Sequence, residues 1–585
     1  MSGAGRHRAA NERRRTPCRT EPRGISLPDL NNPLIVQSDR TILVEVDHPR
    51  YEDARDALAR FAELEKSPEH IHVYRLSPLS LWNAASAGMN ADGVLESLEN
   101  LSKYEIPQNI RREIYDFIER YGQLRLLKED GKLVLESDDP ALIAEVSGLP
   151  SVKQFLAQPL DERRVQVGDR FRGHIKQALI KVGFPVEDLA GYVEGAPLEI
   201  NLRTASDDRK SFTMRDYQQD AVGAFHMNGE PQGGNGVIVL PCGAGKTIVA
   251  LGAMAVLKCH TLVLTANTVA LRQWREELIE KTSLSEEHIG EYSGETKQIR
   301  PVTLATYQIL TYRKSKGDEF EHFGLFDQKG WGLIIYDEVH LLPAPVFRYT
   351  AEIQARRRLG LTATLVREDG REDDVFSLIG PRRYDMPWKL LERQGWIAEA
   401  YCREIRIDLP EARRMSYAVA NRRDKFRIAS ENSRKTEIIR ALLEQHPSDQ
   451  VLIIGLYVRQ LKQIAALFDF PLITGSTPLQ ARLDLYTRVR NGELKRLVVS
   501  KVANFAIDLP DANVAIQISG TFGSRQEEAQ RLGRILRPKA DGSAAIFYSL
   551  ITRNTLDQDY AVNRQLFLTE QGYQYTIHDV SEVRA

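Results

Sequence analysis

The chain has 585 residues, which is too long for one small binding module and leaves room for several folding units. Hydrophobic residues make up 42% and charged residues 27%, a balance that excludes a globally disordered chain. The 79 Lys and Arg residues nearly cancel the 80 Asp and Glu residues, so any surface that binds a polyanion has to be local. The four cysteines are far apart and fit neither a disulfide framework nor a metal cluster, which indicates a reducing compartment.

The first 29 residues are rich in Arg, Pro, Gly and Thr, and we expect them to form a disordered basic tail. They contain no apolar core of the kind that a secretory signal needs. The longest apolar stretch of the chain, Ile248 to Leu257, is also too short to span a membrane. We therefore expect a cytoplasmic protein that has no membrane partner.

Residues 30–203 are predicted to form an N-terminal accessory domain of mixed α+β structure. Its middle contains three helices, one opening at Ser77-Pro78, one near Asp92 to Leu101 and one from about Ile110 to Tyr121. A hairpin with its turn at Glu129-Asp130-Gly131 follows. Three helices and a hairpin are compatible with a winged helix.

The third of these helices has balanced charge, with three arginines set against three acidic residues between Arg111 and Arg120. A helix that reads a DNA groove should be clearly basic. We therefore favour contact with a protein, for example a repair partner, over direct reading of DNA by this region.

The remaining chain alternates short apolar runs with helical segments, which predicts parallel sheets built from βαβ units. The length fits two α/β lobes, at residues 204–392 and 393–585. The buried strands expected in them are Val237–Leu240, Leu262–Leu264, Leu333–Tyr336, Val451–Ile454 and Leu497–Val499.

A phosphate-binding loop is predicted between the first of these strands and the helix that opens at Lys246. Gly243, Ala244 and Gly245 form the tight turn, where backbone N–H groups can face a phosphate chain. Lys246 adds a point charge near the terminal phosphates, and the Thr247 hydroxyl can ligate Mg²⁺. The first glycine of the general pattern is absent, because Leu240 stands in its place.

Two acidic residues, Asp337 and Glu338, follow the strand run Leu333–Tyr336. They are expected at the carboxyl end of a central strand, where α/β sheets bind ligands. Asp337 would hold Mg²⁺ through water, while Glu338 would orient or deprotonate the attacking water.

Near the C-terminus, Gln530, Gly533, Arg534 and Arg537 have the spacing of one helical face. Two arginines and a glutamine on one face suit a triphosphate, and such arginines neutralise charge that develops on the γ-phosphate.

With these motifs the chain resembles the superfamily-two helicases, and among them the XPB type of DNA helicase. The run from Leu240 to Thr247 resembles the phosphate loop of that family, and Asp337-Glu338-Val339-His340 resembles its second motif. The resemblance extends over about Phe212 to Tyr573, and Pro33 to Asp39 is similar to the N-terminal domain of bacterial members. It implies that the two lobes are RecA-like. It also implies ATP-driven 3′-to-5′ unwinding or translocation of DNA, with single-stranded and forked duplex DNA as partners and a role in repair.

The resemblance also assigns roles to further residues. Gln218 would read the adenine edge, with Tyr217 or Arg215 as support. Thr362 and Thr364 resemble the motif that couples hydrolysis to movement, and Asp508 lies in a stretch similar to the fifth motif. Gln530, Arg534 and Arg537 lie in what resembles the last motif. Arg367, Glu368 and Asp369 match the charged triplet that is typical of XPB proteins. The resemblance implies that this triplet acts where the DNA strands separate.

A basic segment, residues 411–435, has eight basic and three acidic residues, with Tyr417 and Phe426 between them. Such a composition suits a groove that tracks phosphates and stacks bases, and Arg422, Arg423 and Lys425 are its candidate contacts. An insertion here forms a thumb-like DNA grip in XPB-like proteins. The alternative is a solvated helical face.

Two other functions stay open at this point. The same motor could translocate on double-stranded DNA without separating the strands, or could act on RNA. A nucleotide-gated scaffold is the third possibility, although the presence of Glu338, Arg534 and Arg537 disfavours it.

Overall fold

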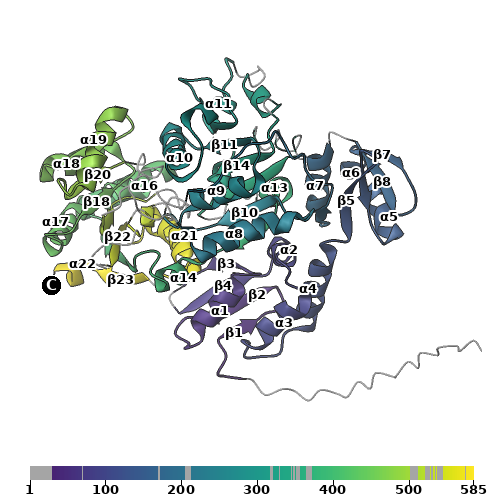
Figure 1. Ribbon diagram of the computed structural model, residues 1–585. Helices are drawn as coiled ribbons and strands as arrows, with labels where there is room; N and C mark the ends of the chain where they lie inside the picture. Colours follow the sequence, from purple (N-terminus) through teal and green to yellow (C-terminus); the bar gives the residue numbers. More distant parts are fainter. Residues whose placement is uncertain are drawn as a thin grey trace, which may run out of the picture.

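The computed structural model describes residues 29–584 with gaps at 69, 169–170, 204–212, 316–320, 328–329, 344–345, 347–349, 351–352, 354–355, 364–371, 501–511, 521–527, 529–530, 534, 537–543 and 574. The described residues form four sheets, two of which have seven strands each. These two sheets and their helices are called lobe 1 and lobe 2 here (Figure 1). None of the described helices has the length and apolar character needed to cross a membrane.

Lobe 1 is built on a fully parallel sheet with the strand order β12-β13-β11-β14-β15-β10-β16. Its strands are β10 (Asn235–Val239), β11 (Thr261–Thr265), β12 (Ile289–Tyr292), β13 (Val302–Thr306), β14 (Leu333–Asp337), β15 (Arg357–Thr362) and β16 (Arg382–Asp385). Its helices are α8 (Asp216–His226), α9 (Lys246–Leu257), α10 (Thr268–Lys281), α11 (Tyr307–Leu310) and α13 (Glu372–Leu378). Every residue of β10, β11 and β13 is buried, as expected for strands covered on both faces.

Lobe 2 has a second fully parallel sheet, with the order β19-β20-β18-β21-β22-β17-β23. Its strands are β17 (Ala400–Ile407), β18 (Val451–Ile454), β19 (Leu472–Ile473), β20 (Arg496–Val499), β21 (Val514–Gln517), β22 (Ala545–Thr552) and β23 (Tyr575–Asp579). Its helices are α15 (Glu411–Val419), α16 (Arg422–Ser430), α17 (Lys435–Gln445), α18 (Val458–Phe468), α19 (Leu479–Arg490), α21 (Leu556–Glu570) and α22 (Val580–Arg584). A connector with the short helix α14 (Trp388–Arg393) joins the two sheets.

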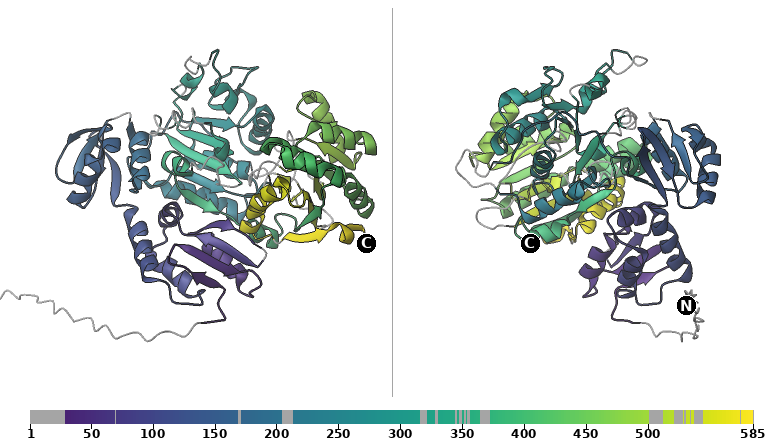
Figure 2. Two further views of the ribbon diagram at one scale, coloured as in Figure 1. Left: turned by 180° about the vertical axis from the view of Figure 1, so that it is seen from behind. Right: turned by 45° about the vertical axis from the view of Figure 1, so that its right-hand side comes forward.

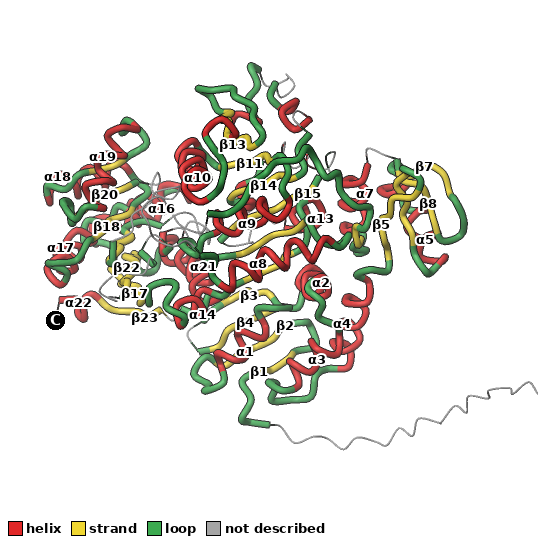
Figure 3. The backbone as a smooth tube through the Cα atoms, in the orientation of Figure 1, coloured by secondary structure: helices red, strands yellow, loops and turns green. Residues whose placement is uncertain are grey.

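The predicted α/β class with two parallel lobes is confirmed. All five expected strands are present, as β10, β11, β14, β18 and β20. Figure 3 shows the strands of both lobes between flanking helices. The edge strands β12, β16, β19 and β23 have two to five residues and were not predicted, because runs so short carry little periodicity.

The first N-terminal unit contains an antiparallel sheet with the order β1-β2-β4-β3. Its elements are β1 (Leu34–Val36), β2 (Thr41–Glu45), α1 (Tyr51–Leu58), β3 (Glu63–Lys66), β4 (Ile71–Arg75), α2 (Pro78–Ser86), α3 (Ala91–Glu99) and α4 (Gln108–Arg120). Helices α2, α3 and α4 are the three that the sequence predicted. The stripe Ile110, Ile114 and Ile118 of α4 is buried in the core of this unit.

The second N-terminal unit has the five-stranded order β7-β8-β6-β5-β9. Its elements are β5 (Leu124–Glu129), β6 (Lys132–Glu136), α5 (Pro140–Gly148), α6 (Pro150–Lys153), β7 (Leu156–Pro159), β8 (Arg164–Val167), α7 (Arg172–Lys181) and β9 (Val186–Asp188). The predicted hairpin is β5 and β6, but it does not form a wing on the three helices. Its apolar residues, such as Leu126 and Leu135, pack in a core separate from that of α4. The winged-helix interpretation is therefore wrong for this region.

The first N-terminal unit contacts both lobes (Figures 1 and 2). On the side of lobe 1, the backbone N–H of Arg382 donates to Asn83 Oδ1 at 3.0 Å. On the side of lobe 2, Leu566 of α21 is 4% exposed and belongs to the hydrophobic core of the unit. The Tyr575 hydroxyl also donates to the Ser67 carbonyl at 3.4 Å. The unit thus spans the two halves of the molecule.

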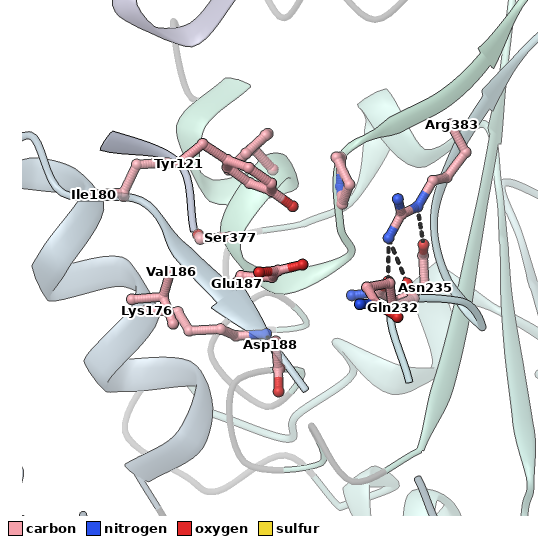
Figure 4. Close-up of a pocket in the computed structure, with 12 residues that line it drawn as sticks. Tyr121, Lys176, Ile180, Val186, Glu187, Asp188, Gln232, Asn235, Ser377 and Arg383 are labelled. Atoms are coloured by element: carbon pink, nitrogen blue, oxygen red, sulfur yellow. Dashed lines mark hydrogen bonds and ion pairs between the residues drawn. The ribbon is translucent and has the colours of Figure 1, made fainter. Parts of the chain in front are cut away.

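The second N-terminal unit packs on lobe 1 through α7, which lies against α13. Gln177 Nε2 donates to Asp374 Oδ1 at 2.8 Å across this interface. A cavity of about 30 Å³ lies between the unit and β10, and Tyr121, Lys176 and Arg383 are among the residues that line it (Figure 4). This volume corresponds to about two water molecules.

Candidate functional site

The predicted phosphate loop joins β10 to α9, and α9 begins at Lys246 as expected. Gly243 and Gly245 have φ angles of 83° and 82°, which place them in the left-handed region that glycine adopts easily. A Cβ atom on Gly245 would also lie 2.5 Å from Gln218 Nε2. Both glycines are therefore required by the shape of the loop. Thr247 lies in the first turn of α9, where free backbone N–H groups favour an anion.

Lys246 and Glu338 are brought together from α9 and the end of β14. The Lys246 Nζ lies 3.5 Å from Glu338 Oε1, and the side chains are only 12% and 19% exposed. Burial by itself lowers the pKa of Lys246, but the nearby negative charges, that of Glu338 first, outweigh it and raise the pKa above its usual value. The lysine is thus held in its charged form.

Asp337 ends β14, and its carboxylate is anchored by an aromatic residue from α10. The Trp274 Nε1–H donates to Asp337 Oδ2 at 2.9 Å, and the Tyr307 hydroxyl donates to the Asp337 carbonyl, also at 2.9 Å. Burial, followed by the charge of Glu338, raises the pKa of Asp337 to about 6, against the opposing effects of Trp274 and Lys246. The carboxylates of Asp337 and Glu338 thus lie close enough for the charge of one to affect the pKa of the other.

Glu338 has φ 49° and ψ 56°, a left-handed conformation that is uncommon for a residue with a side chain. Backbone strain of this kind concentrates at functional sites. Next to it, His340 is 5% exposed, and its Nδ1 lies 2.8 Å from Thr362 Oγ1 and 3.5 Å from Glu338 Oε2. His340 therefore places the acidic pair in contact with Thr362, the predicted coupling residue at the end of β15.

The donor set of this site fits Mg²⁺. Asp337, Glu338 and Thr247 offer only oxygen atoms, which hard cations prefer. The two carboxylates face one lysine, so the pair carries an excess of negative charge that a divalent cation can neutralise. Among the described residues no group of three or more His, Cys, Asp or Glu side chains forms a closed metal cage. A cation held by one or two carboxylates together with substrate phosphates is the usual arrangement for Mg²⁺.

Gln218, on α8, is hydrogen-bonded to the phosphate loop. Its Nε2 donates to the Ala244 carbonyl at 3.0 Å, and its Oε1 accepts the Arg215 backbone N–H at 3.0 Å. The Tyr217 hydroxyl donates to the same Ala244 carbonyl at 2.7 Å, and Arg215 donates to that hydroxyl at 3.0 Å. Gln218 is only 4% exposed, so in this conformation its amide connects the α8 start to the loop.

The one-helix interpretation of residues 530–537 is wrong. Arg531 and Leu532 are helical, but Gly533 and Ile535 form a turn and Leu536 lies outside the helix. Glycine is a poor helix former, and the Leu536 carbonyl accepts the Ala398 N–H of the connector at 2.7 Å. Gln530, Arg534 and Arg537 themselves lie outside the described residues, as do Thr364, Arg367, Glu368, Asp369 and Asp508.

The basic segment 411–435 folds into α15, α16 and the start of α17. Exposed arginines on it include Arg413, Arg414, Arg422 and Arg423. Lys425 is half-buried, with its Nζ 5.7 Å from the centre of the Tyr417 ring.

Two members of this segment are not available to DNA. Phe426 is fully buried, and its ring packs 5.0 Å from that of Tyr560, so it does not stack on bases as the composition suggested. Lys435 is also fully buried and pairs with Asp557 at 2.9 Å. The surface charge of the segment therefore depends on the arginines.

Several contacts of the site were not found from the sequence. Trp274 and Tyr307 donate to Asp337, and His340 lies beside Glu338, although the three residues come from three different elements. Trp396 of the connector stacks on Arg215. His340 belongs to the second motif quoted above, but its contact with Thr362 was not foreseen. Trp274, Tyr307 and Trp396 carry no local signal that separates them from other aromatic residues.

Two parallel lobes, with a phosphate loop and an acidic pair in the first, define an ATP-dependent motor of the superfamily-two helicase class. Residues 391–584 match the model of the ERCC3/RAD25/XPB C-terminal helicase. Residues 211–367 match the type III restriction enzyme res subunit, and residues 34–161 match a helicase conserved C-terminal domain.

Full-length relatives narrow the class further. The DNA 3′-5′ helicase XPB of Mycobacterium tuberculosis is 53% identical over 94% of this chain and 99% of its own length. That of Kineococcus radiotolerans is 54% identical over 94% and 97% of the two lengths. A putative DNA 3′-5′ helicase Rad25 of Haloarcula marismortui is 35% identical over 91% and 82%. The chain belongs to the XPB family of ATP-dependent DNA 3′-5′ helicases.

Proposed function

We propose that the chain hydrolyses ATP at the loop between β10 and α9 and uses the energy to separate DNA strands with 3′-to-5′ polarity during DNA repair. The observation that carries this proposal is the approach of Lys246 to Glu338 within 3.5 Å, because it joins a phosphate-binding cation to a partly buried carboxylate that can act on water. Single-stranded and forked duplex DNA are the proposed substrates, and the cytoplasm is the proposed location.

Each residue of the site has a distinct task in hydrolysis. Lys246, with the backbone N–H groups around Gly243, Ala244 and Gly245, binds the phosphates. Glu338 orients the attacking water and accepts its proton. Thr247 and Asp337 would hold Mg²⁺, which when bound supplies positive charge to the terminal phosphates. Gln218 and Arg215 keep the loop in contact with α8. From this position their side chains contact the adenine base of ATP.

Residues outside the phosphate loop and the acidic pair are also needed to contact the phosphates and the DNA. We assign Arg534 and Arg537 to the γ-phosphate and Gln530 to the nucleotide. Thr362, Thr364 and Asp508 couple hydrolysis to movement. The triplet Arg367, Glu368 and Asp369 acts at the strand junction, and Arg422, Arg423 and Lys425 hold the DNA backbone. The N-terminal units supply a surface for a repair partner.

A strand-displacement assay tests the proposal, with DNA and RNA duplexes that carry tails of either polarity, with and without ATP. We expect ATP-dependent displacement of DNA duplexes with a 3′ tail only. Lys246→Ala should abolish turnover, whereas Glu338→Gln should trap ATP with little loss of binding. Lys281→Ala, a lysine of α10 in the same lobe, is the matched control. ATP-dependent translocation without displacement, or activity on RNA, would instead support the alternative motors.

A further inference from the structure

Trp274 is a buried residue whose only polar group meets the acidic pair. It lies on α10, is 2% exposed, and its Nε1–H donates to Asp337 Oδ2 at 2.9 Å. The neighbouring strands β11 and β14 pair in parallel, which places the helix that follows β11 beside the end of β14. This contact joins two segments that are 63 residues apart in the chain.

An indole N–H can only donate, so a buried tryptophan needs an acceptor nearby. A carboxylate is the strongest acceptor that a side chain offers, and a hydrogen bond to it is short and directional. The bond selects one oxygen of Asp337, because Oδ2 faces α10. The other oxygen, Oδ1, is then the one that a cation can take.

The donor is held rigidly in place. Helix α10 is capped by Asn267, whose Oδ1 accepts the Ala270 N–H at 3.0 Å. Leu271, Trp274 and Leu278 lie on one face and are all buried in the core of lobe 1. The Tyr307 hydroxyl meanwhile fixes the Asp337 backbone from α11. Asp337 is thus held at its carbonyl and at one carboxylate oxygen by two aromatic residues from separate helices.

We propose that Trp274 is a positioning residue of the ATP site, whose N–H fixes the Asp337 carboxylate so that Oδ1 faces the divalent cation of the nucleotide. This inference rests on the proposed function, since it takes Asp337 as a cation ligand. It goes beyond that function because it places the control of cation binding on α10, outside the phosphate loop and the acidic pair.

The test separates the N–H group from the bulk of the ring. Trp274→Phe keeps most of the apolar volume and removes the donor. Trp274→His loses the second ring, but its Nε2 occupies nearly the place of the indole nitrogen, so at pH 8 the neutral ring can still donate. Trp331→Phe is the matched control, because Trp331 is fully buried in the same lobe and donates to the Leu325 carbonyl at 2.8 Å.

The readout is equilibrium binding of a fluorescent, non-hydrolysable ATP analogue as a function of Mg²⁺ concentration, together with melting temperature. For Trp274→Phe we expect the Mg²⁺ concentration at half-saturation to rise about tenfold, with binding in EDTA unchanged and kcat lowered by a similar factor. Trp274→His should recover part of the Mg²⁺ affinity although it melts at a lower temperature than Trp274→Phe. Trp331→Phe should leave the Mg²⁺ dependence at the parent value.

Equal Mg²⁺ dependence in Trp274→Phe and the parent would overturn the inference and would make Trp274 an ordinary core residue. The same conclusion would follow if Mg²⁺ affinity tracked melting temperature across the Phe and His variants. If the parent itself bound the analogue without any dependence on Mg²⁺, the cation site of the proposed function would fail as well. The two failures are therefore distinguishable.

Discussion

The guanidinium carbon of Arg215 lies 4.3 Å from the centre of the Trp396 ring. Arg215 precedes α8 and reaches the phosphate loop through Tyr217, while Trp396 follows α14 in the connector between the lobes. A cation over an indole face is attracted by the ring quadrupole, which contributes about 0.5 to 2 kcal/mol depending on exposure. The loop between β10 and α9 is therefore linked to the connector between the two lobes.

Trp396→Ala should raise the KM for ATP two- to fivefold, because Arg215 loses the ring that holds it beside Tyr217. This range corresponds to about 0.4 to 1 kcal/mol, which suits a ring that is 38% exposed. Steady-state ATP hydrolysis measures it. Trp396→Phe is the control and should lie between the parent and Trp396→Ala, since a phenyl face keeps part of the attraction. Equal values for Phe and Ala would show that the cation contact plays no part.

Replacing Arg422 and Arg423 by Ala should weaken DNA binding to a similar extent on all sequences. Both side chains are exposed on α16, so their loss removes phosphate contacts without disturbing a core. Each lost contact should lower the slope of log affinity against log salt by about 1. Arg459→Ala with Lys462→Ala, two exposed cations on α18 of the same lobe, is the matched control. A salt slope that is equally reduced in the control would assign the effect to net charge alone.

Replacing Arg367, Glu368 and Asp369 by Ala should reduce strand displacement sharply while DNA-stimulated ATP hydrolysis stays near the parent rate. Three adjacent charges are costly to bury without partners, so we expect them to face solvent, DNA or the other lobe. Displacement and hydrolysis are measured on the same forked duplex, together with the melting temperature. A lower melting temperature with a parallel loss of both activities would mean that the triplet only stabilises lobe 1.

Leu566→Ala should loosen the first N-terminal unit from lobe 2. The side chain is 4% exposed within the core of that unit, and truncation of a buried leucine costs about 2 to 5 kcal/mol. Hydrogen exchange measured by mass spectrometry should become faster in α1, β3 and β4. Leu568→Ala is the control, because Leu568 is equally buried on the same helix but belongs to the core of the lobes. Faster exchange of α1 in both variants would contradict the specific contact.

His72 should make the protein less stable as the pH falls from about 6.5 to 4. Burial, followed by the charge of Arg55, lowers the pKa of His72 to about 4, and the Tyr51 hydroxyl lies 2.8 Å from its Nδ1. Between the two pKa values the unfolded chain binds the extra proton, so acid favours unfolding.

His72→Gln should therefore reduce the slope of unfolding free energy against pH by up to about 1.4 kcal/mol per pH unit in this window. Urea denaturation at a series of pH values measures it. An unaltered slope in His72→Gln would show that the histidine is not kept neutral by its surroundings.

The elements that the sequence predicted well are those whose signals are local. The run Val451–Ile454 matches β18, and the helix expected to open at Lys246 is α9, which begins at that residue. Both have several consecutive apolar residues and clear boundaries. The phosphate loop and the acidic pair were found for the same reason, because their residues are adjacent in the chain.

Features that depend on distant contacts could not be predicted. The hairpin around Glu129 was recognised, but not that it packs in a core of its own, since that depends on β8 and β9 much later in the chain. The burial of Phe426 follows from Tyr560, which lies in another helix. The contact of Trp274 with Asp337 likewise requires the order of strands in the sheet, which no local pattern contains.

The first N-terminal unit contacts lobe 1 through Asn83 and lobe 2 through Leu566, so it bridges the two lobes. If the unit keeps its shape, any rotation between the lobes strains one of these two contacts. One contact must then give way, or the unit itself must bend, each time the lobes change their angle. A protein that binds the first N-terminal unit can consequently control how easily the lobes rotate, although it binds far from the phosphate loop.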